Sequence, residues 1–260
     1  MEQFVEKVAA ELHRAEHQQS PIAPLSETYP SITPEQSYAI QRAWLEIKRR
    51  EKGDAFRLFG HKIGLTSLAM QKQLGVDQPD YGFLLDTMVL PSGGTAAFQD
   101  FIMPRIEPEI GFWLAQDVQG PGVTAAMVLA ATRGVSAALE LVDSRIEKWR
   151  IKLVDTIADN ASSARVIVSE REISPNDLAA EEVTLLRNGE PVGAGNGAAV
   201  LGHPAEAVAW LANKLAEFGI GLKAGQFVLP GAMCASALVS PGEEYRARFA
   251  HLGDVSISFV

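Results

Sequence analysis

The sequence has a single cysteine, Cys234, so no disulfide can form within the chain. It has no apolar run long enough to cross a bilayer, and its charged, amphipathic N-terminal segment lacks the pattern of a signal peptide. Basic residues are outnumbered by acidic ones, which leaves a net charge of −9. This charge argues against nucleic-acid or anionic-membrane partners, because both require clustered positive charge. These absences predict a protein of the reducing cytoplasm that acts on a small molecule.

Repeats, low-complexity tracts and a G-x-G-x-x-G motif after a predicted strand are also lacking, so we expect no dinucleotide-binding loop. The 260 residues are 47% hydrophobic, which is enough for one large core, with or without a smaller appendage. We expect residues 1–55 to form a helical segment packed on a main domain that spans residues 56–260.

The N-terminal segment predicts two helices. In the first, Phe4, Val8 and Leu12 recur on one face. The second begins after Thr33, where Pro34 suits the first helical position and Gln36 completes a capping box.

Beyond residue 53, short apolar runs separated by Gly, Pro and Asp predict mostly β structure with a few helices, an α+β fold. Asn188 and Gly189 both tolerate the positive φ of a type I′ turn and predict a hairpin. A helix is expected to begin at Pro204, after a capping His203, and to end before Gly219. The predicted strands are 56–65, 109–114, 136–143, 164–169, 182–193, 226–231, 244–250 and 254–260.

The stretch "PRIEPEIGFW" places two carboxylates in a strand that is otherwise apolar. Side chains alternate faces along a strand, so Glu107 and Glu109 point the same way, roughly 6 to 7 Å apart. Pro108 lacks a backbone donor and suits a strand end or edge. A third carboxylate, Glu140, lies among the apolar residues of "SAALELVD". The competing interpretation is that all three glutamates lie on the solvent faces of half-exposed strands.

Three carboxylates that share one buried pocket repel each other unless a cation neutralises them. A set of oxygen ligands without Cys or His favours Mg²⁺ or Mn²⁺ over zinc. Three protein ligands would leave about three octahedral positions for water and substrate. The pattern therefore predicts a catalytic divalent-metal site.

Other polar residues are candidates for the same site. Lys62 lies in "GHKIGLTS" between apolar neighbours, whereas His61 points to the opposite strand face. Asp77 and Asp80 are expected in a loop, where aspartate commonly caps or turns the chain. Cys234 has no histidine at a spacing that predicts a nucleophilic dyad, so we expect a structural residue there.

Six stretches, taken in order, resemble the 2-keto-4-pentenoate (2-hydroxypenta-2,4-dienoate) hydratases and the related 4-oxalocrotonate decarboxylases of the fumarylacetoacetate hydrolase superfamily. The resemblance covers nearly the whole chain from about residue 20. The stretches are "GHKIGLTS", "GVDQPDYG", "PRIEPEIGF", "ALELVDSRI", "DTIADNAS" and "AAVLGHPAEAVAWLANKL".

The resemblance implies a β-rich roll of mixed sheets with peripheral helices, and a homo-oligomer that can associate with a related decarboxylase or a downstream aldolase. It further implies Mg²⁺ or Mn²⁺ held by Glu107, Glu109 and Glu140. Lys62 and Asp80 match catalytic positions, and Ser162 matches a polar position of the substrate pocket. The activity implied is the addition of water to 2-hydroxypenta-2,4-dienoate, giving 4-hydroxy-2-oxopentanoate, in the degradation of aromatic compounds.

Two alternatives share this metal site. One is decarboxylation of 4-oxalocrotonate, although "RIEKWRIKLVDTIADNAS" and "GHKIGL" resemble the hydratases more. The other is hydration of 2-oxohept-4-ene-1,7-dioate, whose second carboxylate calls for an additional cation in the pocket. Arg105, Arg145 and Arg165 are candidates for that cation.

Overall fold

The computed structural model describes residues 2–67, 71, 76 and 78–260. Its helices are α1 (Glu2–Gln18), α2 (Leu25–Thr28), α3 (Pro34–Lys52), α5 (Ala125–Ala131), α6 (Leu153–Ala158) and α7 (Pro204–Ala216). The strands are β1 (Leu58–Gly64), β2 (Asp80–Leu85), β3 (Val89–Pro91), β4 (Gly94–Ala96), β5 (Arg105–Leu114), β6 (Thr132–Val142), β7 (Ser163–Val168), β8 (Glu182–Arg187), β9 (Glu190–Asn196), β10 (Phe227–Leu229), β11 (Ala237–Leu238), β12 (Glu244–Phe249) and β13 (Asp254–Phe259).

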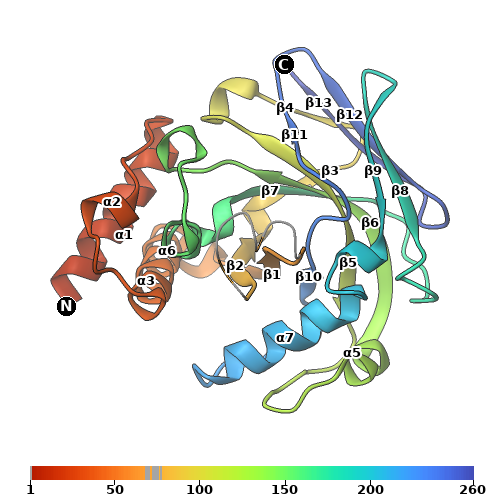
Figure 1. Ribbon diagram of the computed structural model, residues 1–260, viewed down its shortest axis with the longest axis horizontal. Helices are drawn as coiled ribbons and strands as arrows, with labels where there is room; N and C mark the ends of the chain where they lie inside the picture. The colour runs from red at the N-terminus through yellow and green to blue at the C-terminus, as the bar shows by residue number, and fades with distance from the viewer. Residues whose placement is uncertain (1, 68–70, 72–75, 77) are drawn as a thin grey trace.

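The described strands form two sheets that curl around a shared core (Figure 1). The larger sheet has the order β2-β1-β10-β5-β6-β7-β3, with β11 also paired to β5. The smaller sheet has the order β4-β13-β12-β8-β9. Parallel and antiparallel pairs occur in both sheets. The predicted α+β roll of mixed sheets is confirmed.

The helices lie around the sheets, as Figure 1 shows. Helices α1, α2, α3 and α6 group at one end of the molecule, while α5 and α7 lie together at another. The apolar faces of α1 and α3 meet in a cluster that includes Val8, Leu12 and Trp44, and this cluster also takes in Ile146 and Ala158 from later in the chain. The division at residues 55 and 56 stays a prediction.

Several local predictions agree with the structure. Thr33 and Gln36 form the capping box that opens α3. Asn188 and Gly189 both have positive φ at the turn between β8 and β9. His203 Nδ1 accepts a hydrogen bond from Ala205 N at the start of α7, so His203 is the predicted cap.

The prediction that Asp80 lies in a loop is wrong, because Asp80 begins the buried strand β2. The turn-forming residues of "PDYG" concealed this strand, which pairs with β1 in antiparallel register. Asp77 lies outside the described residues. The short strands β3, β4 and β11 and the short helices α2, α5 and α6 were also not predicted, because segments this short carry too few residues for a period to be read.

The prediction that Pro108 marks a strand end or edge is wrong. Pro108 lies inside β5, paired with Leu139 of the central strand β6. On its other side, β5 pairs with β11 at residues 105–106 and with β10 at residues 112–113. Pro108 falls between these two short ladders, where its missing N–H breaks neither of them, and its carbonyl accepts a hydrogen bond from Met233 N.

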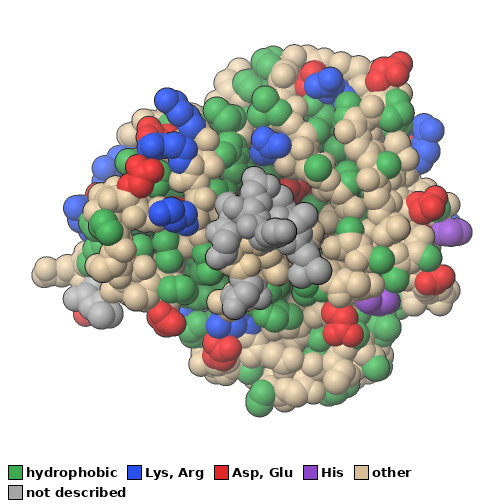
Figure 2. All heavy atoms as spheres, viewed as in Figure 1, with side chains coloured by type: hydrophobic (Ala, Val, Ile, Leu, Met, Phe, Trp, Pro, Cys, Tyr) green, Lys and Arg blue, Asp and Glu red, His purple; other side chains and the backbone are tan. Residues whose placement is uncertain are grey.

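Acidic and basic side chains are interspersed on the face drawn in Figure 2, with apolar side chains between them. Among the described residues, no helix combines the length and the apolar character that a membrane span requires.

Candidate active site

Glu107, Glu109 and Glu140 meet on one face of the larger sheet. Glu107 and Glu140 are direct cross-strand partners in the antiparallel pair of β5 and β6. Glu109 follows on the same face of β5 because side chains alternate along a strand. One carboxylate oxygen from each residue lies within 4.8 Å of the others. This spacing is short enough for three carboxylates to share a single ion.

Strand register brings Lys62 and Asp80 to the same face. Gly64 of β1 pairs with Asp80, and Lys62 of the same strand pairs with Leu229 of β10. The register continues from β10 to β5, where Phe227 pairs with Trp113. Because side chains alternate along each strand, these registers place Lys62, Asp80 and the three glutamates on one side of the sheet. His61 lies on the other side and is buried there, which lowers its pKa to about 4.

Two of the three glutamates have too few partners for buried carboxylates. Glu109 Oε2 accepts a hydrogen bond from Gly231 N at 2.8 Å, but Glu109 Oε1 and Glu140 Oε1 have no partner among the described residues. Burial, followed by the charge of Glu140, raises the pKa of Glu109 well above its usual value. Burial also raises the pKa of Glu140, and it raises that of Glu107 to about 7. Buried carboxylates this close together are stable only if some of them are protonated or if a bound cation neutralises their charge.

Lys62 is the buried cation of this cluster. Its Nζ lies 3.2 Å from Glu140 Oε2 and donates a hydrogen bond to Ala161 O at 2.9 Å. Burial alone would lower the pKa of Lys62, but Glu140, Asp80 and the other two glutamates raise it above its usual value. The ion pair with Glu140 therefore favours the protonated, positively charged form of Lys62.

Ala161, whose carbonyl accepts the hydrogen bond from Lys62, lies in a loop with unusual backbone conformation. Asn160, Ala161 and Ser162 all have positive φ, a conformation that costs energy for residues with side chains. Asn160 stabilises it by accepting from Phe83 N at 2.7 Å and donating to Phe83 O at 3.0 Å. The loop lies so close to β2 that a Cβ at Gly82 would be 2.5 Å from Asn160 O. Strained backbone of this kind commonly marks a functional site.

Asp80 is buried beside Lys62. Thr156 Oγ lies 2.6 Å from Asp80 Oδ2, whereas Oδ1 accepts no hydrogen bond of normal geometry. A Cβ at Gly64 would be 2.3 Å from Oδ1, so the glycine leaves space for this carboxyl group. Burial raises the pKa of Asp80, and the charge of Lys62 opposes that rise.

Ser162 lies in the same loop, and its hydroxyl donates to Asp159 Oδ2 at 3.1 Å. Asp159 also accepts from Ser144 Oγ and from the buried Arg145, which forms an ion pair with it at 2.6 Å. Arg145 further donates to the carbonyls of Asp143 and Ser163. Arg145 is therefore committed to this network and cannot serve as the substrate cation considered above. The substrate-binding role of Ser162 stays a prediction.

The other two arginines point in different directions. Arg105 shares the face of Glu107, and its guanidinium donates to Ser236 Oγ at 2.7 Å and Ser236 O at 3.3 Å. Arg165 pairs with Leu141 and so faces away from Glu140. Cys234 is half-buried, and burial raises the pKa of its thiol to about 11, which leaves it a poor nucleophile.

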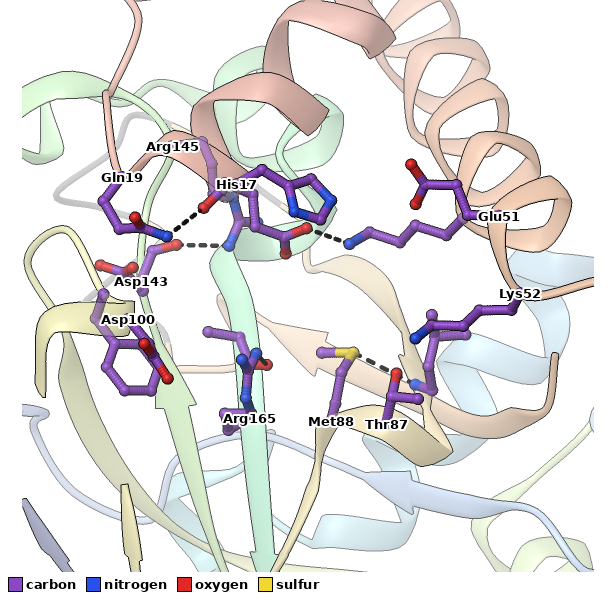
Figure 3. A pocket seen from close by; sticks show the side chains of 15 residues that line it. His17, Gln19, Glu51, Lys52, Thr87, Met88, Asp100, Asp143, Arg145 and Arg165 are labelled. Carbon is purple, nitrogen blue, oxygen red and sulfur yellow. Dashed lines mark hydrogen bonds and ion pairs between the residues drawn. The ribbon is translucent and has the colours of Figure 1, made fainter. Parts of the chain in front are cut away.

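A cavity of about 410 Å³ lies away from these carboxylates, between α1, α3 and β7 (Figure 3). Neither the three glutamates nor Lys62 or Asp80 is among the residues that line it. Most of its charged residues already have partners: Lys48 pairs with Glu16, and Asp143 accepts from two backbone N–H groups. The cavity therefore does not form part of the carboxylate site.

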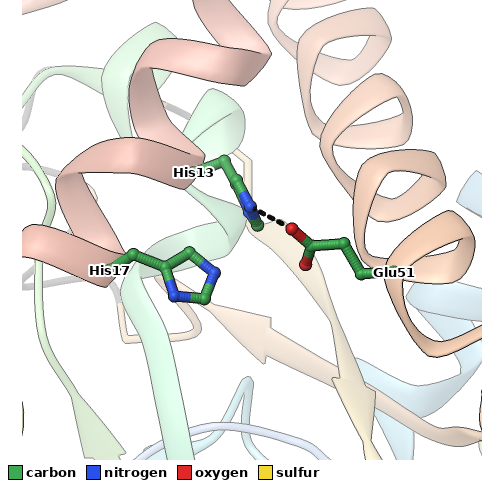
Figure 4. A group of neighbouring side chains, drawn as sticks. All are labelled: His13, His17 and Glu51. Carbon is green, nitrogen blue, oxygen red and sulfur yellow. Dashed lines mark hydrogen bonds and ion pairs between the residues drawn. The ribbon is translucent and has the colours of Figure 1, made fainter.

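A second group of potential metal ligands lies at the rim of this cavity (Figure 4). His13 and His17 are four residues apart on α1, and Glu51 of α3 lies 2.7 Å from His13 Nε2. Trp44 Nε1 donates to His13 Nδ1 at 3.3 Å. Because Nδ1 is an acceptor, the ring proton is on Nε2 and points at Glu51. His13 thus has no free lone pair directed at the cluster, which argues against a metal site there.

Sequence reasoning missed Thr156, Asp159 and Asn160. All three fall in "DTIADNAS", a stretch that carries the resemblance, but nothing in their types or spacing indicates a left-handed loop. Thr156 and Asn160 contact β2, which is distant in the sequence, and Asp159 contacts Ser144 and Arg145.

Comparisons with known proteins agree with this geometry. The chain is 42% identical to 2-hydroxyhexa-2,4-dienoate hydratase of Comamonas testosteroni, over 99% of this chain and 98% of that protein. It is 41% identical to 2-keto-4-pentenoate hydratase of Paraburkholderia xenovorans, over 98% and 94%.

The fold is also similar to that of a solved relative. The structure of 4-oxalocrotonate decarboxylase from Pseudomonas putida G7, complexed with magnesium and adipate, matches with a TM-score of 0.96 and 37% identity, over 100% of this chain and 98% of that one. The model of the fumarylacetoacetate (FAA) hydrolase C-terminal family matches residues 69–260. This chain therefore belongs to the fumarylacetoacetate hydrolase family.

Proposed function

We propose that this protein is a divalent-metal-dependent hydratase that adds water to 2-hydroxypenta-2,4-dienoate, or a close homologue, to give a 4-hydroxy-2-oxo acid. The observation that carries the proposal is the meeting of three clustered glutamates with Lys62 and Asp80 on one sheet face. Hydratases of such dienoates are among the relatives at about 40% identity over nearly the whole chain.

The residues fit a bound Mg²⁺ or Mn²⁺. Glu107, Glu109 and Glu140 would hold the ion, because they offer oxygen ligands only and two of their buried oxygens lack any other partner among the described residues. The solved relative at 37% identity is a magnesium complex. When bound, the ion would supply a Lewis acid for the 2-oxygen of the substrate.

Lys62, Asp80 and Ser162 would then have separate roles in the reaction. Lys62 stays protonated beside Glu140 and would stabilise negative charge on the enolate rather than accept a proton. Asp80, with its raised pKa, is suited to orient the water that attacks C4 and to exchange a proton with it. Ser162 would contact the substrate from the left-handed loop.

Decarboxylation of 4-oxalocrotonate is the second candidate, favoured by the similarity to the solved decarboxylase. Both reactions use the same charge stabilisation, so the glutamates do not distinguish them. We further propose that the protein works in the cytoplasm as a homo-oligomer, with a related decarboxylase or a downstream aldolase as a partner.

We expect Glu107→Gln to weaken Mg²⁺ or Mn²⁺ binding by about tenfold or more. The substitution keeps the shape of the side chain but removes one of three anionic ligands. Isothermal titration calorimetry with each ion measures the change.

The matched control for this variant is Glu190→Gln, because Glu190 is an exposed strand glutamate away from the site. The control should bind metal as the wild type does. An unchanged metal affinity in Glu107→Gln would show that Glu107 is not a metal ligand and would favour the alternative, a glutamate that faces solvent.

Metal should stabilise the protein more at high pH than at low pH. The pKa of Glu107 rises from 4.5 to about 7 on folding, so its contribution to the stability of the metal-free protein is complete below about pH 4.5 and lost as the pH rises through about 7. Bound metal takes the place of these protons. We expect the rise in Tm caused by Mg²⁺ to be larger at about pH 8 than at about pH 5. An equal rise at both pH values would contradict the assignment.

A further inference from the structure

Thr156 is a buried residue of α6 that the proposed reaction has not yet used. Its Oγ lies 2.6 Å from Asp80 Oδ2 and 3.0 Å from Leu153 O, a carbonyl of its own helix. A hydroxyl has one proton, so Thr156 can donate to only one of these oxygens at a time. The other contact must then be stabilised in a different way.

The two protonation states of Asp80 resolve this competition. When Asp80 is ionised, the hydroxyl of Thr156 donates to Oδ2. When Oδ2 carries a proton, Asp80 becomes the donor to Thr156 Oγ, and the hydroxyl proton is free to rotate towards Leu153 O. In both states a hydrogen bond therefore joins Thr156 to Asp80 Oδ2, and the change needs only a rotation of the hydroxyl group.

We propose that Thr156 is a positioning residue for Asp80, and that its hydroxyl switches between Asp80 and Leu153 O so that the carboxyl group keeps one orientation in both protonation states. A group that gives and takes a proton during turnover needs this property, because loss of a hydrogen bond in either state would let it turn away. The inference rests on the proposed function, in which Asp80 exchanges a proton with water.

The surroundings of Asp80 leave this role to Thr156. Among the described residues, the charged and titratable groups that interact electrostatically with Asp80 are Lys62 of β1, Glu107 of β5 and Tyr38 of α3. Among these, Lys62 donates a hydrogen bond to Ala161 O, and within the described part of the chain no hydrogen bond joins Glu107 or Tyr38 to Asp80. Asp80 Oδ1 is buried without a hydrogen bond of normal geometry. Thr156 is therefore the side chain that holds Oδ2.

The test is Thr156→Val, which keeps the shape and removes the hydroxyl, compared with Thr156→Ser, which keeps the hydroxyl. A hydrogen bond to an ionised group is stronger than one to a neutral group, so Thr156→Val should raise the pKa of Asp80 by about one unit. The acidic limb of the kcat profile should shift to higher pH by the same amount. Thr156→Ser should match the wild type in both measurements.

The pKa of Asp80 can be measured without turnover, in metal-loaded protein with ¹³C-labelled aspartate, its signal assigned by its loss in Asp80→Asn. Thr132→Val is the matched control, because Thr132 also donates to a helix carbonyl, that of Val128, but lies at the far end of β6 from Glu140. Should Thr156→Val not fold, as judged by circular dichroism, Thr156→Ala replaces it.

An unchanged Asp80 pKa and pH profile in the folded variant without the hydroxyl would overturn the inference. An equal shift in Thr132→Val would also overturn it, because the effect would then be general. If the wild type does not hydrate 2-hydroxypenta-2,4-dienoate, the proposed function fails, but the carboxyl titration still decides whether Thr156 controls Asp80.

Discussion

Exhaustive removal of divalent metal is expected to abolish turnover of 2-hydroxypenta-2,4-dienoate, and Mg²⁺ or Mn²⁺ should restore it. Without a cation, the carboxylates of Glu107, Glu109 and Glu140 tend to hold protons, because burial raises the pKa of each. Protonated carboxyl groups do not supply the Lewis acid that the proposed reaction requires. The loss should therefore approach the full catalytic effect of the site, several orders of magnitude.

The measurement is the loss of the dienoate chromophore in protein treated with a chelator, with metal content determined by atomic spectroscopy. Circular dichroism of the same sample establishes that the fold survives. Full activity in protein shown to be metal-free would contradict the metal-dependent mechanism and leave the family membership unaffected.

Asp80→Asn is expected to reduce hydration by about 10²- to 10⁴-fold, the usual range for loss of a positioned acid or base. Metal binding should be nearly unchanged, because Asp80 lies in β2 and is not one of the three clustered glutamates. Deuterium uptake into the substrate, which needs the enolate but no attacking water, should largely survive. The variant would thus lose hydration while keeping deuterium exchange.

Deuterium incorporation is followed by NMR, and hydration by formation of 4-hydroxy-2-oxopentanoate. The matched control is Asp86→Asn, which alters an exposed aspartate just beyond β2 and should leave both rates unchanged. Equal loss of exchange and hydration in Asp80→Asn would assign Asp80 to the enolisation step instead.

The wild-type protein also distinguishes the hydratase from the decarboxylase. A decarboxylase would release CO₂ from 2-oxohex-3-enedioate and hydrate the five-carbon dienoate slowly. We expect hydration to dominate. Release of CO₂ as the main activity would change the assigned reaction and leave the metal site as proposed.

Much of the local structure could be predicted from the sequence because it depends on neighbouring residues. The capping box of Thr33 and Gln36 and the turn at Asn188 and Gly189 are short-range hydrogen-bond and φ preferences. Alternation along one strand was enough to place Glu107 and Glu109 on a common face. The ordered set of stretches that resemble dienoate hydratases was enough to identify the family.

The assembly of the site was decided by the tertiary structure. Pairing of β5 with β6 put Glu140 opposite Glu107, and pairing of β1 with β2 and β10 brought Lys62 and Asp80 to the same face. The left-handed loop, the contact between Thr156 and Asp80, and the commitment of Arg145 to Asp159 also depend on segments far apart in the chain. Alternation determines which residues share a face of one strand, but only long-range pairing determines which strands become neighbours and which face is buried.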